Sequence, residues 1–176
     1  MRSSVRFALI AAATVGCRSI QVGSPPPTPT TAAATMRDAS GGQIGTINLA
    51  DSRAGLVLTG TVSGLGLGAH GIHVHETGTC VAPFATAGGH FNPDKHQHGF
   101  KNPNGNHAGD LPSISTPASG QYRFEQLLPG VTLRGDKGLL DADGAAIVIH
   151  AAGDDYTTDP SGNSGGRIAC GVIVVR

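Results

Sequence analysis

The sequence lacks a charge imbalance, a long hydrophobic run and any sustained helical period. Its 176 residues include twelve basic and twelve acidic side chains, so the formal net charge is zero. A neutral chain gives no electrostatic reason to expect nucleic acid or a broad acidic partner surface. The missing helical period argues against a helical domain. The length fits one domain with short appendages.

The N-terminus is typical of an export signal. Two arginines precede the apolar run FALIAAATVG at residues 7–16, which is too short to span a membrane comfortably. Cys17 follows directly, as in a bacterial lipoprotein signal, where that cysteine becomes the lipid-modified first residue; the usual leucine three positions earlier is Thr14 here. We expect export to the periplasm or cell envelope, with a membrane lipid anchor on Cys17. The alternative is a plain cleaved signal peptide, with Cys17 lost or left free.

The chain then divides into a tether and a folded domain. Residues 18–34 include SPPPTPTTAAA, a composition that cannot build a core and predicts an extended tether. Without a lipid, this stretch is equally well a leftover with no role. Residues 35–176 form the predicted domain, after a signal at 1–17.

The rest of the chain has the pattern of an all-β protein. Glycine is abundant, at 27 residues, and separates short β-branched runs as turns would. The runs lie at residues 43–50, 55–65, 70–76, 122–128, 144–151 and 167–175. We therefore expect a β-sandwich or β-barrel.

Cysteine is scarce, with three residues in the chain. If Cys17 carries lipid, Cys80 and Cys170 remain, and in an oxidising compartment they most simply pair. A bridge closing a loop of roughly 90 residues would contribute about 4 to 5 kcal/mol in the chain-entropy model.

Histidine is concentrated in one part of the chain. In GIHVHE, His73 and His75 alternate with Val74, so a strand would place both imidazoles on one face. The segment from Thr77 to Asp110 shows no regular pattern, and a loop of this length is usually functional. The candidate metal ligands exceed the number that one zinc site needs, which indicates two adjacent metals; spacing alone does not divide them. They are His73, His75, His90, His96, His98, His107, Asp110 and His150.

The segments GIHVHE, GGHFNP, HAGDLP, IVIHA and GGRIACGVI, in this order, resemble the signature segments of copper/zinc superoxide dismutases. The resemblance runs from about residue 35 to the C-terminus. It implies a Greek-key β-sandwich or flattened β-barrel of about eight antiparallel strands with a long metal-binding loop. It also implies that copper and zinc ions are the cofactors and that the superoxide anion is the substrate.

The resemblance assigns a ligand set and several supporting residues. The implied copper ligands are His73, His75, His90 and His150. The implied zinc ligands are His90, His98, His107 and Asp110, with His90 bridging both metals and taking part in catalysis. In the supporting positions, Arg167 lies beside the copper channel, Asp154 links copper- and zinc-binding histidines, and Cys80 pairs with Cys170. Without the resemblance, Arg167 reads as a strand-end charge and Asp154 as a turn carboxylate. His70 and His96 take structural roles.

The implied reaction is dismutation of superoxide by a redox-cycling copper next to a structural zinc, which would protect the cell envelope. The loop at residues 153–166 is short and contains no lysine, whereas eukaryotic members of the family carry a longer loop with lysine there. Lys95 and Lys101 are our candidates for attracting the anion. The alternative function is an exported, non-enzymatic copper/zinc-binding protein, whose signature would be a lost ligand or lost channel arginine. A purely structural sandwich would not explain the ordered ligands. The sequence does not decide oligomeric state, and a homodimer is compatible with it.

Overall fold

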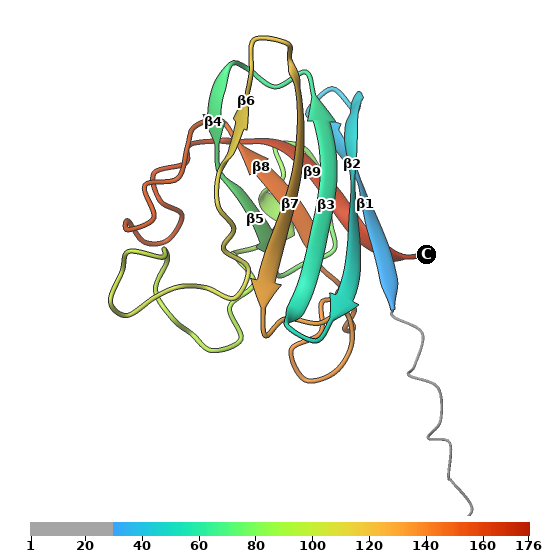
Figure 1. Ribbon diagram of the computed structural model, residues 1–176, viewed down its shortest axis with the longest axis vertical. Helices are drawn as coiled ribbons and strands as arrows, with labels where there is room; N and C mark the ends of the chain where they lie inside the picture. Colours follow the sequence, from blue (N-terminus) through green and yellow to red (C-terminus); the bar gives the residue numbers. More distant parts are fainter. Residues whose placement is uncertain (1–29) are drawn as a thin grey trace, which may run out of the picture.

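The computed structural model describes residues 30–176 and confirms the all-β prediction (Figure 1). The predicted signal, Cys17 and most of the tether lie outside the described residues. Within residues 30–176, no helix is long and apolar enough to cross a membrane. The strands are β1 (Thr31–Asp38), β2 (Gln43–Ser52), β3 (Gly55–Ser63), β4 (Gly68–His70), β5 (Ile72–His75), β6 (Ile114–Thr116), β7 (Gln121–Pro129), β8 (Ala146–His150) and β9 (Arg167–Val175), with one 3-10 turn, η1 (Ala85–Ala87).

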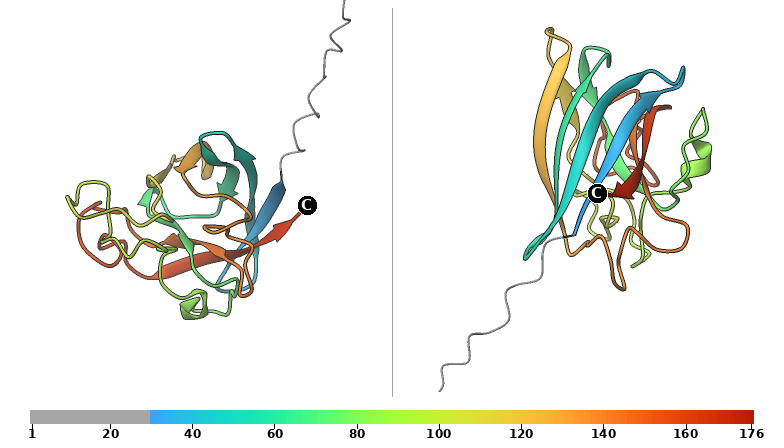
Figure 2. Two further views of the ribbon diagram at one scale, coloured as in Figure 1. Left: turned by 90° about the horizontal axis from the view of Figure 1, so that it is seen from below. Right: turned by 90° about the vertical axis from the view of Figure 1, so that its right-hand side faces the viewer.

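The strands form a curled antiparallel sheet that folds back on itself as a half-barrel. Seven strands pair in the order β5-β8-β9-β1-β2-β3-β7, and β4 pairs separately with β6. Figure 2 shows the curl, which brings β5, β8 and β9 opposite β2, β3 and β7. All pairings between named strands are antiparallel in the described part of the chain.

The first strand begins inside the stretch that we assigned to the tether. β1 runs from Thr31, so residues 31–34 belong to the sheet, where they pair with β2 on one side and β9 on the other. The sequence TAAATMRD carries no β-branched apolar residue, so its composition gave little strand signal. Its alanines are nevertheless buried, and Ala32 and Ala34 belong to the main core.

Two apolar layers position the metal-binding residues. The main core fills the half-barrel and includes Ile47, Leu58 and Ile147. A second cluster lies on the outer side of β8 and β9 and contains Phe84, Ala146 and Val148. β5 and β8 are consequently buried on both faces. Long loops cover their outer face, and these loops carry the remaining histidines (Figure 1).

The predicted disulfide is present between Cys80 and Cys170. It attaches the loop that follows β5 to the middle of β9, across 90 residues of chain. Cys170 is buried in the second apolar cluster and Cys80 packs against it. The loop over the outer face of β8 is thus fixed covalently as well as by packing.

Candidate metal centre

Strand β5 separates its histidines from its apolar residues, as the alternation predicts. Ile72 and Val74 lie in the main core, whereas His73 and His75 face the covered outer side. The Val74 backbone also receives two loop segments, since its N–H donates to Gly109 O at 2.9 Å and its carbonyl accepts from Phe91 N at 2.8 Å. A Cβ at Gly109 would collide with the Val74 carbonyl oxygen, so this close approach requires glycine. Both loop segments are thereby held against β5.

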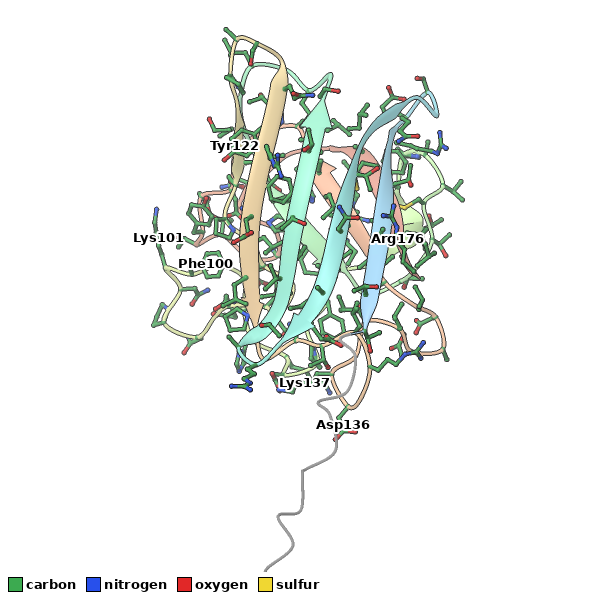
Figure 3. All side chains as sticks on the ribbon, turned by 45° about the vertical axis from the view of Figure 1, so that its right-hand side comes forward. Phe100, Lys101, Tyr122, Asp136, Lys137 and Arg176 are labelled. Carbon is green, nitrogen blue, oxygen red and sulfur yellow. A yellow bond between two sulfur atoms is a disulfide. The ribbon has the colours of Figure 1, made fainter. Side chains whose placement is uncertain are left out.

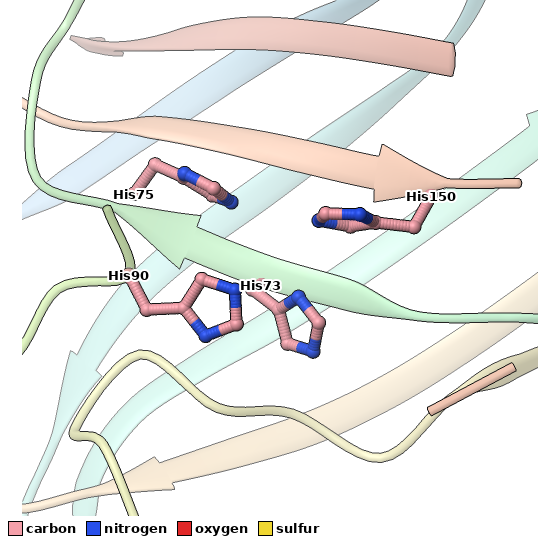
Figure 4. A group of neighbouring side chains, drawn as sticks. All are labelled: His73, His75, His90 and His150. Atoms are coloured by element: carbon pink, nitrogen blue, oxygen red, sulfur yellow. The ribbon is translucent and has the colours of Figure 1, made fainter. Parts of the chain in front are cut away.

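Four imidazoles meet beside β5 and β8 (Figure 4). We call this set the strand group; it consists of His73, His75, His90 and His150. One ligand atom from each residue lies within 4.8 Å of those of the other three, and all four residues are buried. His150 ends β8, and His90 lies in the loop, joined to β5 by an isolated bridge with His75.

One nitrogen of each ring in the strand group is held, and the other is unpartnered. His73 Nε2 contacts Asp154 Oδ2 at 2.7 Å, His75 Nδ1 contacts Gly88 O at 3.0 Å, and His150 Nδ1 contacts Gly165 O at 3.1 Å. A ring that donates to an oxygen keeps its lone pair on the opposite nitrogen. The buried nitrogens without a hydrogen-bond partner among residues 30–176 are His73 Nδ1, His75 Nε2, His90 Nε2 and His150 Nε2. These four nitrogens are the ones that a metal ion would satisfy.

A second set of ligand atoms lies on the other side of His90. We call it the loop group; it consists of His90, His98, His107 and Asp110. Asp110 Oδ1 lies 2.8 Å from His90 Nδ1, 3.1 Å from His98 Nδ1 and 3.4 Å from His107 Nδ1, and the Nδ1 atoms of His90 and His107 are 3.3 Å apart. A tetrahedral zinc ion with ligand distances of about 2.0 to 2.1 Å sets its ligand atoms about 3.3 Å apart. The four measured separations, 2.8 to 3.4 Å, are close to this spacing, so the loop group could hold a zinc ion.

His73 also lies within 4.8 Å of His90, His98 and Asp110, which gives a second way to draw the group. We assign His107 instead, because its Nδ1 directly contacts both Asp110 and His90. His73 Nε2 is already engaged by Asp154, and its Nδ1 faces the strand group.

Asp154 connects the two groups. Its Oδ2 contacts His73 Nε2 at 2.7 Å and its Oδ1 contacts His98 Nε2 at 3.0 Å. Burial alone would raise the pKa of Asp154, but the contacts with His73 and His98 outweigh it and the pKa falls well below its usual value. The carboxylate therefore stays ionised and orients one ring of each group.

His98 differs in proton affinity from the strand-group histidines in the metal-free protein. Burial, which is the largest cause, lowers the pKa of His73 to about 3, that of His75 to about 2 and that of His150 to about 4. Burial also opposes charge on His98, but hydrogen bonds to Asp110 and Asp154 raise its pKa to about 9. The strand group is thus neutral at pH 7, whereas His98 carries a proton.

An open cavity of about 530 Å³ leads to this centre. Its wall includes Arg167, Lys95 and Glu76, and its floor includes His90 and His150. The Arg167 guanidinium donates to Phe84 O at 2.7 Å and to Gly88 O at 2.6 Å, so the disulfide-bonded loop fixes its position. The same Gly88 carbonyl accepts from His75. Such backbone carbonyls leave no residue-type signal in a sequence, and the sequence analysis did not identify them.

The structure separates the remaining candidates from the two groups. His96 is exposed in the loop, and His70 is a buried residue at the end of β4, with ring nitrogens 2.8 Å from His150 O and 2.9 Å from Gly66 O. Lys101 lies 5.3 Å from the centre of the Tyr156 ring and does not line the cavity, whereas Lys95 does. Figure 3 shows Lys101 at the outer edge of the molecule, beside Phe100.

Comparison with known proteins identifies the family. The family model for copper/zinc superoxide dismutase matches residues 43–173. "Superoxide dismutase [Cu-Zn] 1" of Aquifex aeolicus is 45% identical over 137 residues, which cover 76% of this chain and 81% of that protein. "Superoxide dismutase [Cu-Zn]" of Caulobacter vibrioides is 41% identical, over 81% and 84% respectively.

Solved structures agree with this result. A superoxide dismutase-like protein of Bacillus subtilis superposes with a TM-score of 0.78 at 39% identity, covering 81% of this chain and 97% of that one. The copper/zinc enzyme of Brucella abortus gives a TM-score of 0.68 at 31% identity, over 82% and 99%. Seven buried candidate ligands lie in two groups that share His90, on a half-barrel like those of these relatives. Together with the family match, they lead to one conclusion: the chain belongs to the copper/zinc superoxide dismutase family.

Proposed function

We propose that this protein dismutates superoxide, with copper bound by the strand group and zinc bound by the loop group. The observation that carries the proposal is the set of four buried, unpartnered imidazole nitrogens next to a tetrahedral set of three nitrogens and one carboxylate oxygen. His90 belongs to both sets through its two nitrogens. Through these two nitrogens, His90 would help to hold both ions, one in each group.

The donor atoms support this division of the metals. The strand group offers four imidazole nitrogens and no oxygen, a set that suits copper. The loop group adds the Asp110 carboxylate and has the spacing of a tetrahedral zinc site. The backbone N–H groups of Gly99 and His107 both donate to Asp110 Oδ2 at 3.0 Å, which leaves Oδ1 directed at the three histidines.

Each residue has a defined task in the reaction. Copper, when bound, supplies reversible one-electron chemistry, which zinc cannot. Arg167 attracts the superoxide anion into the cavity and holds it by charge. His90 holds and releases a proton at Nε2 while its Nδ1 stays in the loop group. Two superoxide anions and two protons give one dioxygen and one hydrogen peroxide, so the cavity must admit protons as well as the anion.

The proposal extends to the location of the protein. We propose that the chain is exported to the periplasm or cell envelope, where it is anchored by lipid on Cys17 and protects against superoxide. The signal-like N-terminus supports export, and two similar proteins, from Caenorhabditis elegans and Haemonchus contortus, are named extracellular superoxide dismutases. Mass determination of the membrane fraction tests the lipid, and sedimentation of the mature protein tests the proposed homodimer.

The experiment that tests the activity compares metal states of a lipid-free chain of residues 18–176, which keeps β1 intact. Dismutation is measured on metal-free protein, with zinc alone, and with copper and zinc, while bound metal is determined each time. We expect activity only in the copper-containing forms. Full binding of both metals without dismutation would instead favour a non-enzymatic, exported metal-binding protein.

A further inference from the structure

The loop that joins β8 to β9 contacts the loop group through Asp159, a residue without a predicted role. Asp159 Oδ1 accepts a hydrogen bond from the backbone N–H of His98 at 2.6 Å. The same oxygen lies 3.7 Å from His107 Nε2. One carboxylate therefore faces two members of the loop group from a segment about 60 residues away in sequence.

The contact completes the hydrogen bonding of the backbone around His98. The N–H of Gln97 donates to Asn104 O at 3.0 Å, and that of Gly99 donates to Asp110 Oδ2 at 3.0 Å. Three consecutive amides thus have acceptors from three different segments. Without Asp159, the amide of His98 would lose its acceptor next to a fully buried imidazole, which leaves the ring less firmly placed.

The residues that follow Asp159 form part of the cavity wall. Pro160 and Ser161 line the same cavity as Arg167 and His150. The position of this wall therefore depends on where Asp159 is fixed. Through Asp159, the wall is tied to the backbone that carries a loop-group ligand.

We propose that Asp159 is a positioning residue that holds His98 in the zinc site and fixes the Pro160–Ser161 wall of the cavity to it. The inference rests on the proposed assignment of zinc to the loop group. The hydrogen bond to His98 carries most of the effect. The approach to His107, at 3.7 Å, is too long for a hydrogen bond, and a side chain that is 50% exposed gains little from charge alone.

Because the hydrogen bond from Asp159 to His98 should matter more than the charge of Asp159, the alanine and asparagine variants should differ in zinc affinity. Asp159→Ala removes the acceptor, and we expect the zinc affinity of the metal-free protein to fall by about 10-fold or more, as for other partners of metal ligands. Asp159→Asn keeps an oxygen acceptor at the same place, so its zinc affinity should stay within about threefold of the original. Thr157→Ala changes an exposed neighbour in the same loop and should leave zinc affinity unchanged.

The measurement is competition with a chelator, for zinc and for copper separately, together with the absorption spectrum of cobalt(II) bound at the zinc site. The proposal expects zinc affinity to fall and the cobalt spectrum to change in Asp159→Ala, with copper affinity and metal-free thermal stability retained. An unchanged zinc affinity overturns it. A parallel fall of copper affinity, zinc affinity and metal-free stability also overturns it, because this would show a general loosening of the fold.

Asp110→Asn separates this inference from the assignment on which it rests. If Asp110→Asn leaves zinc binding intact, the loop group is not the zinc site and the assignment itself fails. If Asp110→Asn abolishes zinc binding and Asp159→Ala does not weaken it, only the role of Asp159 is refuted.

Discussion

The strand group and the loop group share one residue but are built by different means. The strand group stands on paired strands, and backbone carbonyls of Gly88 and Gly165 orient two of its rings. The loop group stands on segments without regular structure, and carboxylates orient it: Asp110 at the ligand position, Asp154 behind His98. Burial keeps the rings of His73, His75 and His150 neutral and ready for metal. In the second group, the carboxylates of Asp110 and Asp154 keep His98 protonated until metal displaces the proton.

We expect the largest effect when one imidazole of the strand group is removed, because copper binding should be lost while zinc binding is kept. We expect His150→Ala to abolish dismutation and to lower copper affinity by more than the roughly 100-fold that outer partners cost. Zinc affinity should change only a few-fold, because His150 does not belong to the loop group. Metal titration and the dismutation assay measure both effects. His96→Ala, which removes an exposed histidine outside both groups, is the matched control. A comparable loss of zinc would mean that the groups are not separable.

Substitution of a glycine beside Asp154 should lower the metal affinity of both groups at once. Gly162 has φ +63°, and a Cβ there would overlap Asp154 Oδ1 and approach His98 Nε2 to 2.7 Å. We expect Gly162→Ala to displace the carboxylate from His73 and His98 and to lower both metal affinities by about 10- to 100-fold.

Gly166 provides the control for this substitution in the same loop. A Cβ at Gly166 meets no atom within 4 Å. Gly166→Ala should therefore bind both metals as the original protein does. Loss of one metal alone in Gly162→Ala would argue that Asp154 serves a single group.

The pH dependence of metal binding should sharpen the contrast. His98 has a pKa of about 9, so below that pH zinc must displace its proton. Apparent zinc affinity should therefore rise by about tenfold per unit between roughly pH 6.5 and 8.5. The rings of His73, His75 and His150, with pKa values of about 3, 2 and 4, are already neutral in this range, so copper affinity should be nearly flat. Calorimetry in buffers of different ionisation enthalpy counts the protons that each metal releases on binding. If the affinities for zinc and copper changed equally with pH, the proposed difference between the two groups would be contradicted.

The smallest expected effect concerns the approach of the substrate. Lys95 lines the cavity with Arg167, so Lys95→Gln should lower kcat/KM by roughly two- to fivefold at low ionic strength and flatten its salt dependence. Lys101→Gln changes a lysine that lies over Tyr156, outside the cavity lining, and is the control. Pulse radiolysis over a range of salt concentrations measures both. If kcat/KM depended equally on salt concentration in the two variants, Lys95 would not attract the substrate.

The sequence predicted the parts of this molecule that depend on side-chain type. Alternation in GIHVHE placed His73 and His75 on one face, and the scarcity of cysteine predicted the bond between Cys80 and Cys170. The resemblance to a family supplied the division of ligands, which spacing alone left open.

The remaining features depend on backbone atoms and on contacts between distant segments. β1 was not predicted as a strand, because its alanines have little strand propensity and the strand is held by pairing with β2 and β9. The carbonyls of Phe84 and Gly88 that fix Arg167 belong to no motif. In the sequence, nothing distinguishes Asp159 from the other acidic residues of its loop; only the fold places it beside His98.

The start of β1 also limits how the domain can be released from an anchor. Thr31 pairs with Ala50, and its carbonyl accepts a hydrogen bond from the N–H of Arg176, so the two ends of the domain meet in the sheet. If the proposed lipid anchor on Cys17 is present, a protease that cuts before Thr31 would release the domain with all its strands intact. A cut a few residues later removes part of a strand between β2 and β9 and opens the sheet at its centre. Cleavage sites that would release the domain intact and sites that would disrupt its sheet are thus separated by only a few residues.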